Sequence, residues 1–342
     1  GLDFVEQALK IDSTKAFIID SKAVALKNLG RFKEAKEWYE KKFEITKNEE
    51  DKMEIGICQR RMGLGSDDDL KHGYWIEAIK IFDSILEKNK SNREVWYNKS
   101  LCYWNLNKYD DAKKSLQEAI KINSNIKKYW FELAEIANIE EKYQQSILFF
   151  DKSIEIAPTL EDYLGKANAL FELENYEEAE SCYDDAISIY DGTELYQYRN
   201  KIKLIAIVWN NKGNSLLEQK KNSEAIDCFD KSIKIAPKYK MPVAHKGNAL
   251  RLTKKYDDAI KCLNDALELD PKYYWAQNQL ILAYKDWKKY DDAIKIAEQT
   301  LKQYPDKDEK TTKILVEIYE ELGYTSKQKE YEEKLQKLKD LK

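Results

Sequence analysis

Four of the five prolines close segments that repeat about every 34 residues, and this period limits what the chain can fold into. They are Pro158, Pro237, Pro271 and Pro305. The tetrad Tyr-Asp-Asp-Ala follows the same period, at Tyr109–Ala112, Tyr256–Ala259 and Tyr290–Ala293. Related tetrads stand at Phe32–Ala35, Tyr143–Ser146, Tyr176–Ala179 and Asn222–Ala225. Self-similarity at a fixed period of this length predicts a solenoid of stacked units.

Each period also carries small and aromatic residues at fixed distances from the last residue of the tetrad. A small residue lies twelve positions before it, at Ala23, Ser100, Ala134, Ala167, Gly213 and Gly247. Another small residue lies seven positions after it, at Ala119, Ser153, Ala186, Ser232, Ala266 and Thr300. An aromatic residue often lies sixteen positions before it, at Trp96, Trp130, Tyr163 and Trp209.

This combination resembles the tetratricopeptide repeat (TPR) family over nearly the whole chain. The resemblance implies an all-α fold, a right-handed TPR α-solenoid in which every repeat is a pair of helices. The spacing of apolar residues agrees, since Val243–Leu252 and Tyr256–Leu269 are both amphipathic around a short polar turn. Small side chains at the crossing points let paired helices approach closely, and proline ends the second helix. We expect about nineteen helices and no β-sheet.

We expect a single array over residues 1–342. A half repeat occupies 1–13, because Phe4–Ile11 resembles a second helix without its first helix, as in a piece cut from a longer protein. We interpret the Glu/Lys-rich segment 309–342 as C-terminal capping helices that cover the open end of the stack. Full repeats are expected at about 16–47, 52–90, 93–126, 127–159, 160–191, 206–239, 240–273 and 274–307.

Two insertions interrupt the period. Gly63 to Gly73 replaces a turn of about three residues, and we interpret it as a solvated loop because loops tolerate added length. Its three adjacent acids, Asp67 to Asp69, do not match the alternating ligand spacing of a calcium loop. The second insertion, Asp191–Leu204, is expected to extend the next helix, giving a long first helix that ends near Gln219.

Composition argues against several classes of partner. The net charge is −4 and the isoelectric point is about 5.7, which gives no general attraction to nucleic acid or anionic lipid. No apolar run is long enough to cross a membrane, and no signal-peptide pattern opens the sequence. None of the five cysteines lies in a CxxC pair, so we expect reduced thiols. These features predict a cytoplasmic protein without nucleic-acid binding or membrane insertion.

Catalysis has little support in the sequence. The only two histidines, His72 and His245, have no Cys, Ser or Asp partner at a motif spacing. No phosphate loop, HExxH or GxSxG motif is present. We therefore expect a chain that is not an enzyme and that needs no cofactor or metal.

Binding is better supported, because in a TPR stack the first helices line a concave groove. Asparagine recurs along these helices, and its amide can pair with the backbone of an extended peptide. Aromatic residues between the amides could anchor side chains, and the arrangement resembles the asparagine-lined groove of the TPR part of O-GlcNAc transferase. The predicted groove residues are Tyr97, Asn98, Trp104, Asn105, Phe131, Asn138, Asn168, Phe171, Asn210, Asn211, Asn214, His245, Asn248, Arg251, Trp275, Asn278, Gln279 and Lys285.

The leading hypothesis is a noncatalytic protein–protein interaction scaffold that binds a peptide or partner segment in the groove. Alternatives are a regulatory or substrate-recruiting region of a larger enzyme or assembly, and a self-assembling scaffold that associates through its terminal repeats. A heat-shock cochaperone is disfavoured. Family members with that role carry a carboxylate clamp of Lys and Asn in one repeat, Asn in the next, and Lys and Arg in the third. In the corresponding windows this chain has Asn210 and Asn214, then His245, then Trp275 and Gln279, so one Asn matches and the basic residues are missing.

Overall fold

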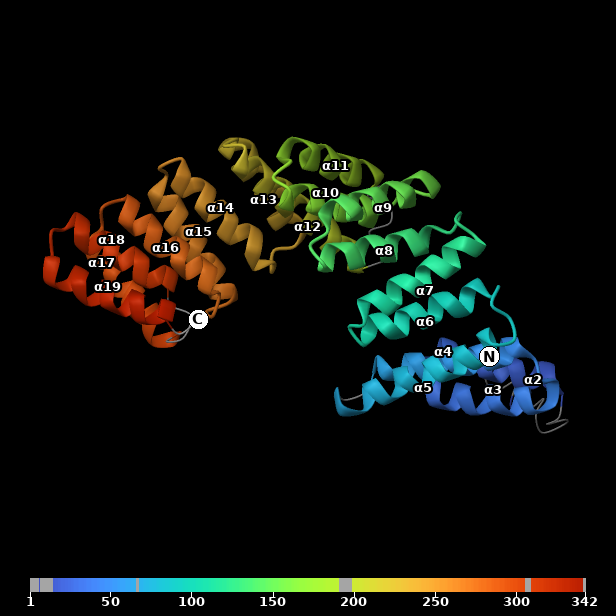
Figure 1. Cartoon of the computed structure of the whole chain (residues 1–342). Helices are drawn as coiled ribbons and strands as arrows, with labels where there is room; N and C mark the ends of the chain where they lie inside the picture. Colours follow the sequence, from blue (N-terminus) through green and yellow to red (C-terminus); the bar gives the residue numbers. More distant parts are fainter. Residues whose placement is uncertain (1–5, 7–14, 66–67, 191–198, 305–308, 341–342) are drawn as a thin grey trace. The chain divides into compact units, whose positions relative to one another are not determined.

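The computed structural model describes residues 6, 15–65, 68–190, 199–304 and 309–340. These residues form 18 helices and no strand, which confirms the predicted all-α solenoid class (Figure 1). Apart from Glu6, the expected half repeat at Phe4–Ile11 lies outside the described residues. The chain divides into two compact units, Gly1–Ala157 and Pro158–Lys342, and each is considered by itself.

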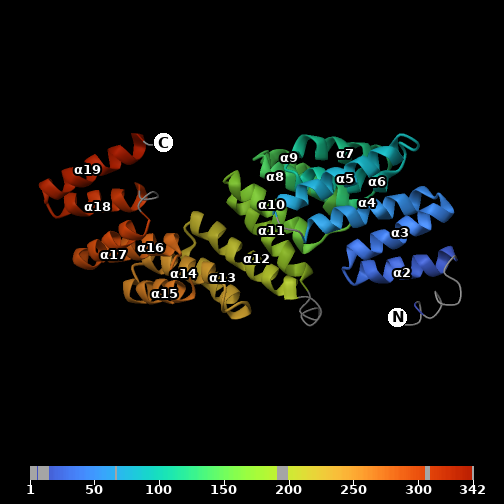
Figure 2. The same cartoon turned by 90° about the horizontal axis from the view of Figure 1, so that it is seen from below.

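Eight helices in the described part of the N-terminal unit pack in consecutive pairs (Figures 1 and 2). They are α2 (Ala16–Asn28), α3 (Phe32–Thr46), α4 (Glu49–Gly63), α5 (Asp68–Leu86), α6 (Arg93–Asn105), α7 (Tyr109–Ile122), α8 (Lys127–Ile139) and α9 (Tyr143–Ile156).

The C-terminal unit repeats the same plan in ten helices of its described part. They are α10 (Leu160–Glu172), α11 (Tyr176–Ile189), α12 (Arg199–Glu218), α13 (Asn222–Ile235), α14 (Lys240–Leu252), α15 (Tyr256–Leu269), α16 (Tyr274–Asp286), α17 (Tyr290–Gln303), α18 (Glu309–Glu321) and α19 (Thr325–Asp340).

Glycine lets paired helices pack closely at several crossing points, and two of them lie in the C-terminal unit. A Cβ added at Gly213 would lie 2.5 Å from Cε1 of Phe229, and one added at Gly247 would lie 2.7 Å from Cγ of Leu263. In each case a residue of the first helix meets the fully buried residue that stands four positions after the tetrad's last residue, in the second helix. The period of small residues therefore follows from contacts within each helix pair.

Most first helices end in the same turn. The residue two positions after the helix adopts a left-handed conformation, and its N–H and the next N–H bond back to carbonyls of the last turn, as in a Schellman motif. In α10, for example, Glu174 (φ 62°) donates to Phe171 and Asn175 donates to Leu170. Glycine holds this position only at Gly30 and Gly323 among the described turns. Elsewhere the left-handed residue is Asn107, Glu141, Glu174, Lys220, Lys254 or Lys288.

The two insertions behave differently from ordinary loops. The interpretation of Gly63 to Gly73 as a solvated loop is wrong for its larger part, because α5 begins at Asp68. The segment continues without a break into the core residues Trp75 and Ala78, so its backbone bonds are satisfied by helix rather than water. The expected long first helix is found as α12, from Arg199 to Glu218, while 191–198 lie outside the described residues.

In the C-terminal unit, the first helix of each pair also contacts the first helix of the next pair. These contacts join α10 to α12, α12 to α14, α14 to α16 and α16 to α18. Among the described residues, no second helix makes a comparable contact with the second helix of the following pair. The first helices thus form a continuous layer, which we call the inner face.

Candidate functional site

A cavity of about 320 Å³ lies on the inner face of the C-terminal unit. Helix α10 contributes Asn168, Phe171 and Glu172, and α12 contributes Asn211 and Asn214; Tyr183 reaches the cavity from α11. The structure therefore brings together four of the predicted groove residues, Asn168, Phe171, Asn211 and Asn214. The volume is at the low end for ligand sites, which suits part of an extended chain better than a large ligand.

A chain of hydrogen bonds fixes the side chains around this cavity. Oδ1 of Asn168 accepts from the Tyr183 hydroxyl at 2.9 Å and from Nδ2 of Asn211 at 3.0 Å. Oδ1 of Asn211 in turn accepts from Nδ2 of Asn210 at 3.0 Å. The amide oxygen of Asn210 then lies 2.8 Å from Nδ1 of His245. One network therefore runs through α11, α10, α12 and α14.

The network leaves specific polar groups available to a ligand. Nδ2 of Asn168 makes no hydrogen bond within the described residues, and its orientation is set because Oδ1 accepts two bonds. The half-buried amide of Asn214 also has no partner within the described residues. Phe171 also lines the cavity with an aromatic surface, and its ring packs edge-on against Tyr176, with ring centroids 5.3 Å apart. The cavity thus combines fixed amides with an apolar contact.

Burial controls the ionisation of the groups at the ends of this network. The pKa of the Tyr183 hydroxyl is raised, chiefly by burial, so the group keeps its proton and donates to Asn168. Burial lowers the pKa of His245 to about 4, which makes the imidazole neutral at pH 7. Its ring packs edge-on against Trp275 at a centroid distance of 4.9 Å. Neither group is arranged for acid–base exchange with solvent near neutrality.

The remaining predicted residues of α14 and α16 are largely engaged with neighbouring side chains. Arg251 donates to Asn248 Oδ1 at 2.9 Å and pairs with Asp286. Lys285 pairs with Glu317 at 2.6 Å and with Glu321 at 3.4 Å. These ion pairs hold successive first helices together.

Three predicted asparagines are buried within the fold. Asn98 is 6% exposed, and Asn210 and Asn278 are fully buried. Asn98 and Asn278 both donate to a carbonyl of their own helix, and Asn278 also accepts from Thr311 at 2.9 Å. Gln279 is 5% exposed, and its Oε1 has no partner. Asparagines of the first helices therefore have two roles here. Some line the cavity, and others are buried and make hydrogen bonds within the layer of helices.

The predicted residues of the N-terminal unit form a separate polar surface on α6 and α8. Tyr97 donates to Glu132 at 3.4 Å, and burial raises the pKa of the Glu132 carboxyl. Asn138 has a buried Oδ1 without a partner, whereas Asn105 donates to the Leu101 carbonyl. Trp104 and Phe131 pack edge-on against the second helices, on Tyr109 and Phe150 respectively.

Two cavity residues were not among the predicted site residues, Glu172 and Tyr183. Tyr183 stands four positions after the tetrad's last residue, where the adjacent repeats have Phe150 and Phe229. A tyrosine in a phenylalanine position is a signal available in the sequence, because a buried hydroxyl needs a partner. Glu172 ends α10 as one acid among many on the surface, and its type alone gives no such signal.

Two further properties concern membranes and metals. Among the described residues, none of the helices combines the length and the apolar character needed to cross a bilayer. Within the same residues, no three or more His, Cys, Asp or Glu side chains are grouped to hold a metal ion.

Two family models, both described as Tetratricopeptide repeat, match segments along the chain. One family model matches residues 206–239 and 244–273, and another of the same description matches 20–49, 94–126, 127–160 and 163–192. Together the matched segments cover more than half of the chain. A search of curated proteins found no sequence match.

Several solved structures are similar in fold. A chain of the APC/C hetero-tetramer Cut9–Hcn1 superposes with a TM-score of 0.54 at 19% identity, over 92% of this chain and 58% of that one. A tetratricopeptide repeat protein from Parabacteroides merdae gives 0.50 at 17% identity, over 78% and 98% of the two chains. Pseudomonas aeruginosa pilF gives 0.50 at 18% identity, over 62% and 92%. At these identities the likeness establishes the fold alone.

Proposed function

This chain belongs to the tetratricopeptide repeat family, and we propose that it is a noncatalytic interaction scaffold whose C-terminal unit holds an extended segment of a partner protein. The observation that carries the proposal is the cavity lined by α10 and α12, where Phe171 lies with Asn214 and with the network-held amides of Asn168 and Asn211. A cytoplasmic location and a role without cofactors are part of the same proposal.

The chemistry of the cavity favours a polypeptide backbone as the bound group. Asn168 offers a free Nδ2 donor, and Asn214 offers both a donor and an acceptor. An extended peptide presents alternating N–H and C=O groups of the same kind. Because Asn168 is held by Tyr183 and Asn211 before any ligand arrives, little side-chain entropy is lost on binding.

The charged groups of the inner face argue against a partner that is captured mainly by its negative charge. Arg251 is paired with Asp286, and Lys285 is paired with two glutamates of α18. Glu172 adds a carboxylate to the cavity itself. A strongly acidic tail would have to displace these internal ion pairs, which supports setting the heat-shock cochaperone role aside.

The proposal is tested by selecting ligands from a phage-displayed library of random dodecapeptides against the whole chain. The peptide with the strongest binding is then synthesised, and its affinity is measured by isothermal titration calorimetry. Asn214→Ala should weaken binding by roughly twofold to tenfold, the effect of one or two hydrogen bonds. Phe171→Ala should weaken it by at least as much if the ring is an anchor.

Asn264→Ala provides a matched control. Asn264 is an exposed asparagine of α15 in the same unit and has no partner within the described residues. The control variant should bind as the unchanged protein does. Failure to select any peptide would contradict the proposal, and so would normal affinity in both cavity variants at unchanged melting temperature.

A further inference from the structure

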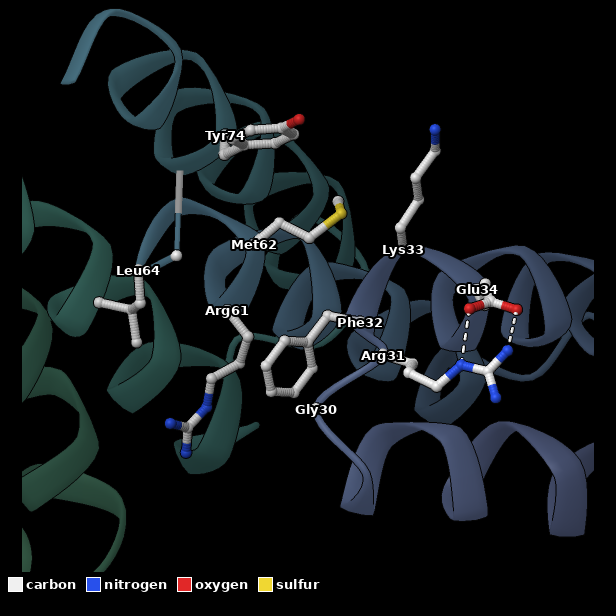
Figure 3. A pocket seen from close by; sticks show the side chains of 10 residues that line it. Gly30, Arg31, Phe32, Lys33, Glu34, Arg61, Met62, Leu64 and Tyr74 are labelled. Carbon is white, nitrogen blue, oxygen red and sulfur yellow. Dashed lines mark hydrogen bonds and ion pairs between the residues drawn. The ribbon is translucent and has the colours of Figure 1, made fainter. Parts of the chain in front are cut away.

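A second cavity, of about 570 Å³, lies in the N-terminal unit at the ends of two helix pairs (Figure 3). Its walls come from the turn between α2 and α3, from the end of α4 and the residues after it, and from the start of α5. We call it the turn-end cavity. It is lined by Gly30, Arg31, Phe32, Lys33, Glu34, Arg61, Met62, Leu64, Gly65 and Tyr74.

The insertion in the second repeat creates one wall of this cavity. In the repeats that carry a tetrad, the second helix begins at the first residue of the tetrad. By contrast, α5 begins seven residues before Trp75, which precedes the buried Ala78 by three residues as the first tetrad residue precedes the last. A Cβ added at Gly63 would collide with the Trp75 ring, so glycine at the end of α4 lets α5 pass close by. The extra helical turns bring Tyr74 to the cavity.

The lining combines an apolar surface with unpaired positive charge. Phe32, Met62 and Tyr74 are half-buried, and the Leu64 side chain is 53% exposed. Figure 3 shows the Phe32 ring between the side chains of Arg61 and Arg31.

Within the described part of the chain, the charged residues that line the cavity divide into one ion pair and two cations without a carboxylate partner. Arg31 is held by Glu34 through two hydrogen bonds of 2.7 and 2.6 Å, which the dashed lines in Figure 3 mark. Lys33 and Arg61 are exposed, and neither has a carboxylate partner among the described residues. Among the side chains that the structure describes, the cavity therefore has two cations without a carboxylate partner beside an apolar surface.

We propose that the turn-end cavity binds an acidic peptide segment that carries a large apolar side chain, at a site separate from the inner face of the C-terminal unit. The apolar side chain would lie on Phe32, Met62 and Leu64, and carboxylates on either side of it would pair with Lys33 and Arg61. Complementary charge supplies orientation, and burial of apolar surface supplies affinity.

The same features disfavour nucleic acid as the occupant. Binding to a phosphate backbone needs a row of cations, because each neutralised phosphate adds a separate contribution. Of the cations that line this cavity, two have no carboxylate partner among the described residues, and Glu34 adds an acid beside them. A short acidic–apolar peptide needs no more than these two.

Fluorescence anisotropy with synthetic peptides tests the proposal on the whole chain. The probe is a fluorescein-labelled peptide in which Glu and Asp alternate with Leu and Phe. One control peptide replaces Leu and Phe by Ser, and another replaces the acids by Lys. We expect binding of the acidic–apolar probe alone, and weaker binding as the salt concentration rises.

The paired substitution Lys33→Gln with Arg61→Gln should weaken binding by roughly fivefold to tenfold, the effect of two exposed ion pairs. The matched control is Lys90→Gln with Lys108→Gln, which removes two exposed lysines elsewhere in the same unit. Leu64→Ser tests the apolar contact and should weaken binding without lowering the melting temperature, since this side chain is mostly exposed.

Independence from the first site is checked with Asn214→Ala, which should leave binding of the acidic–apolar probe unchanged. Equal loss in the two paired variants would overturn the proposal, because net charge alone would then explain binding. Binding of the Ser-substituted peptide with the same affinity as the probe would also overturn it. No detectable binding of the probe at low salt would have the same consequence.

Discussion

Nδ1 of His245 lies 2.8 Å from the amide oxygen of Asn210. An amide oxygen can only accept, so the imidazole donates through Nδ1. Burial lowers the pKa of His245 to about 4, and the ring at pH 7 is therefore the neutral tautomer with its proton on Nδ1. This pair links α14 to the asparagine network of α12 and makes the network sensitive to acid.

Acidification should destabilise the C-terminal unit through His245. The pKa is about 4 in the folded protein and near the ordinary 6.5 when unfolded, so the unfolded chain binds a proton first. The contribution of His245 to stability is complete above about pH 6.5 and is lost as the pH falls towards 4, by at most about 1.4 kcal/mol per pH unit. Chemical denaturation at several pH values measures it.

His245→Gln should remove this part of the pH dependence while keeping a donor for Asn210. The comparison must be made as a difference between the two proteins, because the half-buried Glu132 and Glu135 have raised pKa values and act with the opposite sign. An identical pH dependence in both proteins would contradict the assignment.

Two glycine substitutions should have opposite effects. Gly213→Ala should destabilise the fold by about 1–3 kcal/mol, because its Cβ would lie 2.5 Å from the buried Phe229 ring. Gly73→Ala should stabilise α5 by about 0.5–1 kcal/mol, because nothing lies within 4 Å of the added carbon. Urea denaturation of each protein gives both values, and the same sign for both would show that local packing does not decide the outcome.

Tyr183→Phe should lower stability by about 0.5–1.5 kcal/mol, since it removes one donor to Asn168 and leaves the packing unchanged. Tyr324→Phe is the control, because that side chain is 58% exposed. Equilibrium denaturation should show a loss for Tyr183→Phe alone. A comparable loss in the control would mean that hydroxyl removal has a general effect.

Lys254→Gly should stabilise the protein by up to about 1 kcal/mol, because Lys254 adopts φ 63° and glycine accepts this conformation without strain. Lys261→Gly, seven residues later in the middle of α15, should instead destabilise by about 1 kcal/mol. Thermal melting of the two variants should therefore move in opposite directions.

Much of the fold can be predicted from the sequence, because the residues that pack paired helices together belong to the same repeat. Gly213 meets Phe229 and Gly247 meets Leu263 at the same separation along the chain, so a pattern of small residues predicts these crossings. The extension of α5 is harder to predict, because glycines at both ends and a run of aspartates are typical of a loop. Only its continuation into Trp75 and Ala78 indicates a helix.

The sequence predicts the candidate site only in part. Spacing assigns Asn168, Asn210, Asn211 and Asn278 to first helices, but it does not say which amide reaches the surface. Asn210 is buried, and its amide oxygen pairs with His245 of the next first helix. Asn278 is also buried, and its amide oxygen accepts from Thr311. These partners lie more than thirty residues away, and a pattern within one repeat contains no information about them.

The layer of first helices has a mechanical consequence. Neighbouring helix pairs of the C-terminal unit meet through the first helix of the later pair, which contacts both helices of the pair before it, whereas second helices make no comparable contacts with each other among the described residues. Pulling on such a stack would open it one joint at a time, because a break between neighbouring pairs costs only the contacts at that joint. A partner segment bound between α10 and α12 would contact both helices and so connect two neighbouring pairs. It should therefore make that part of the stack stiffer than the rest.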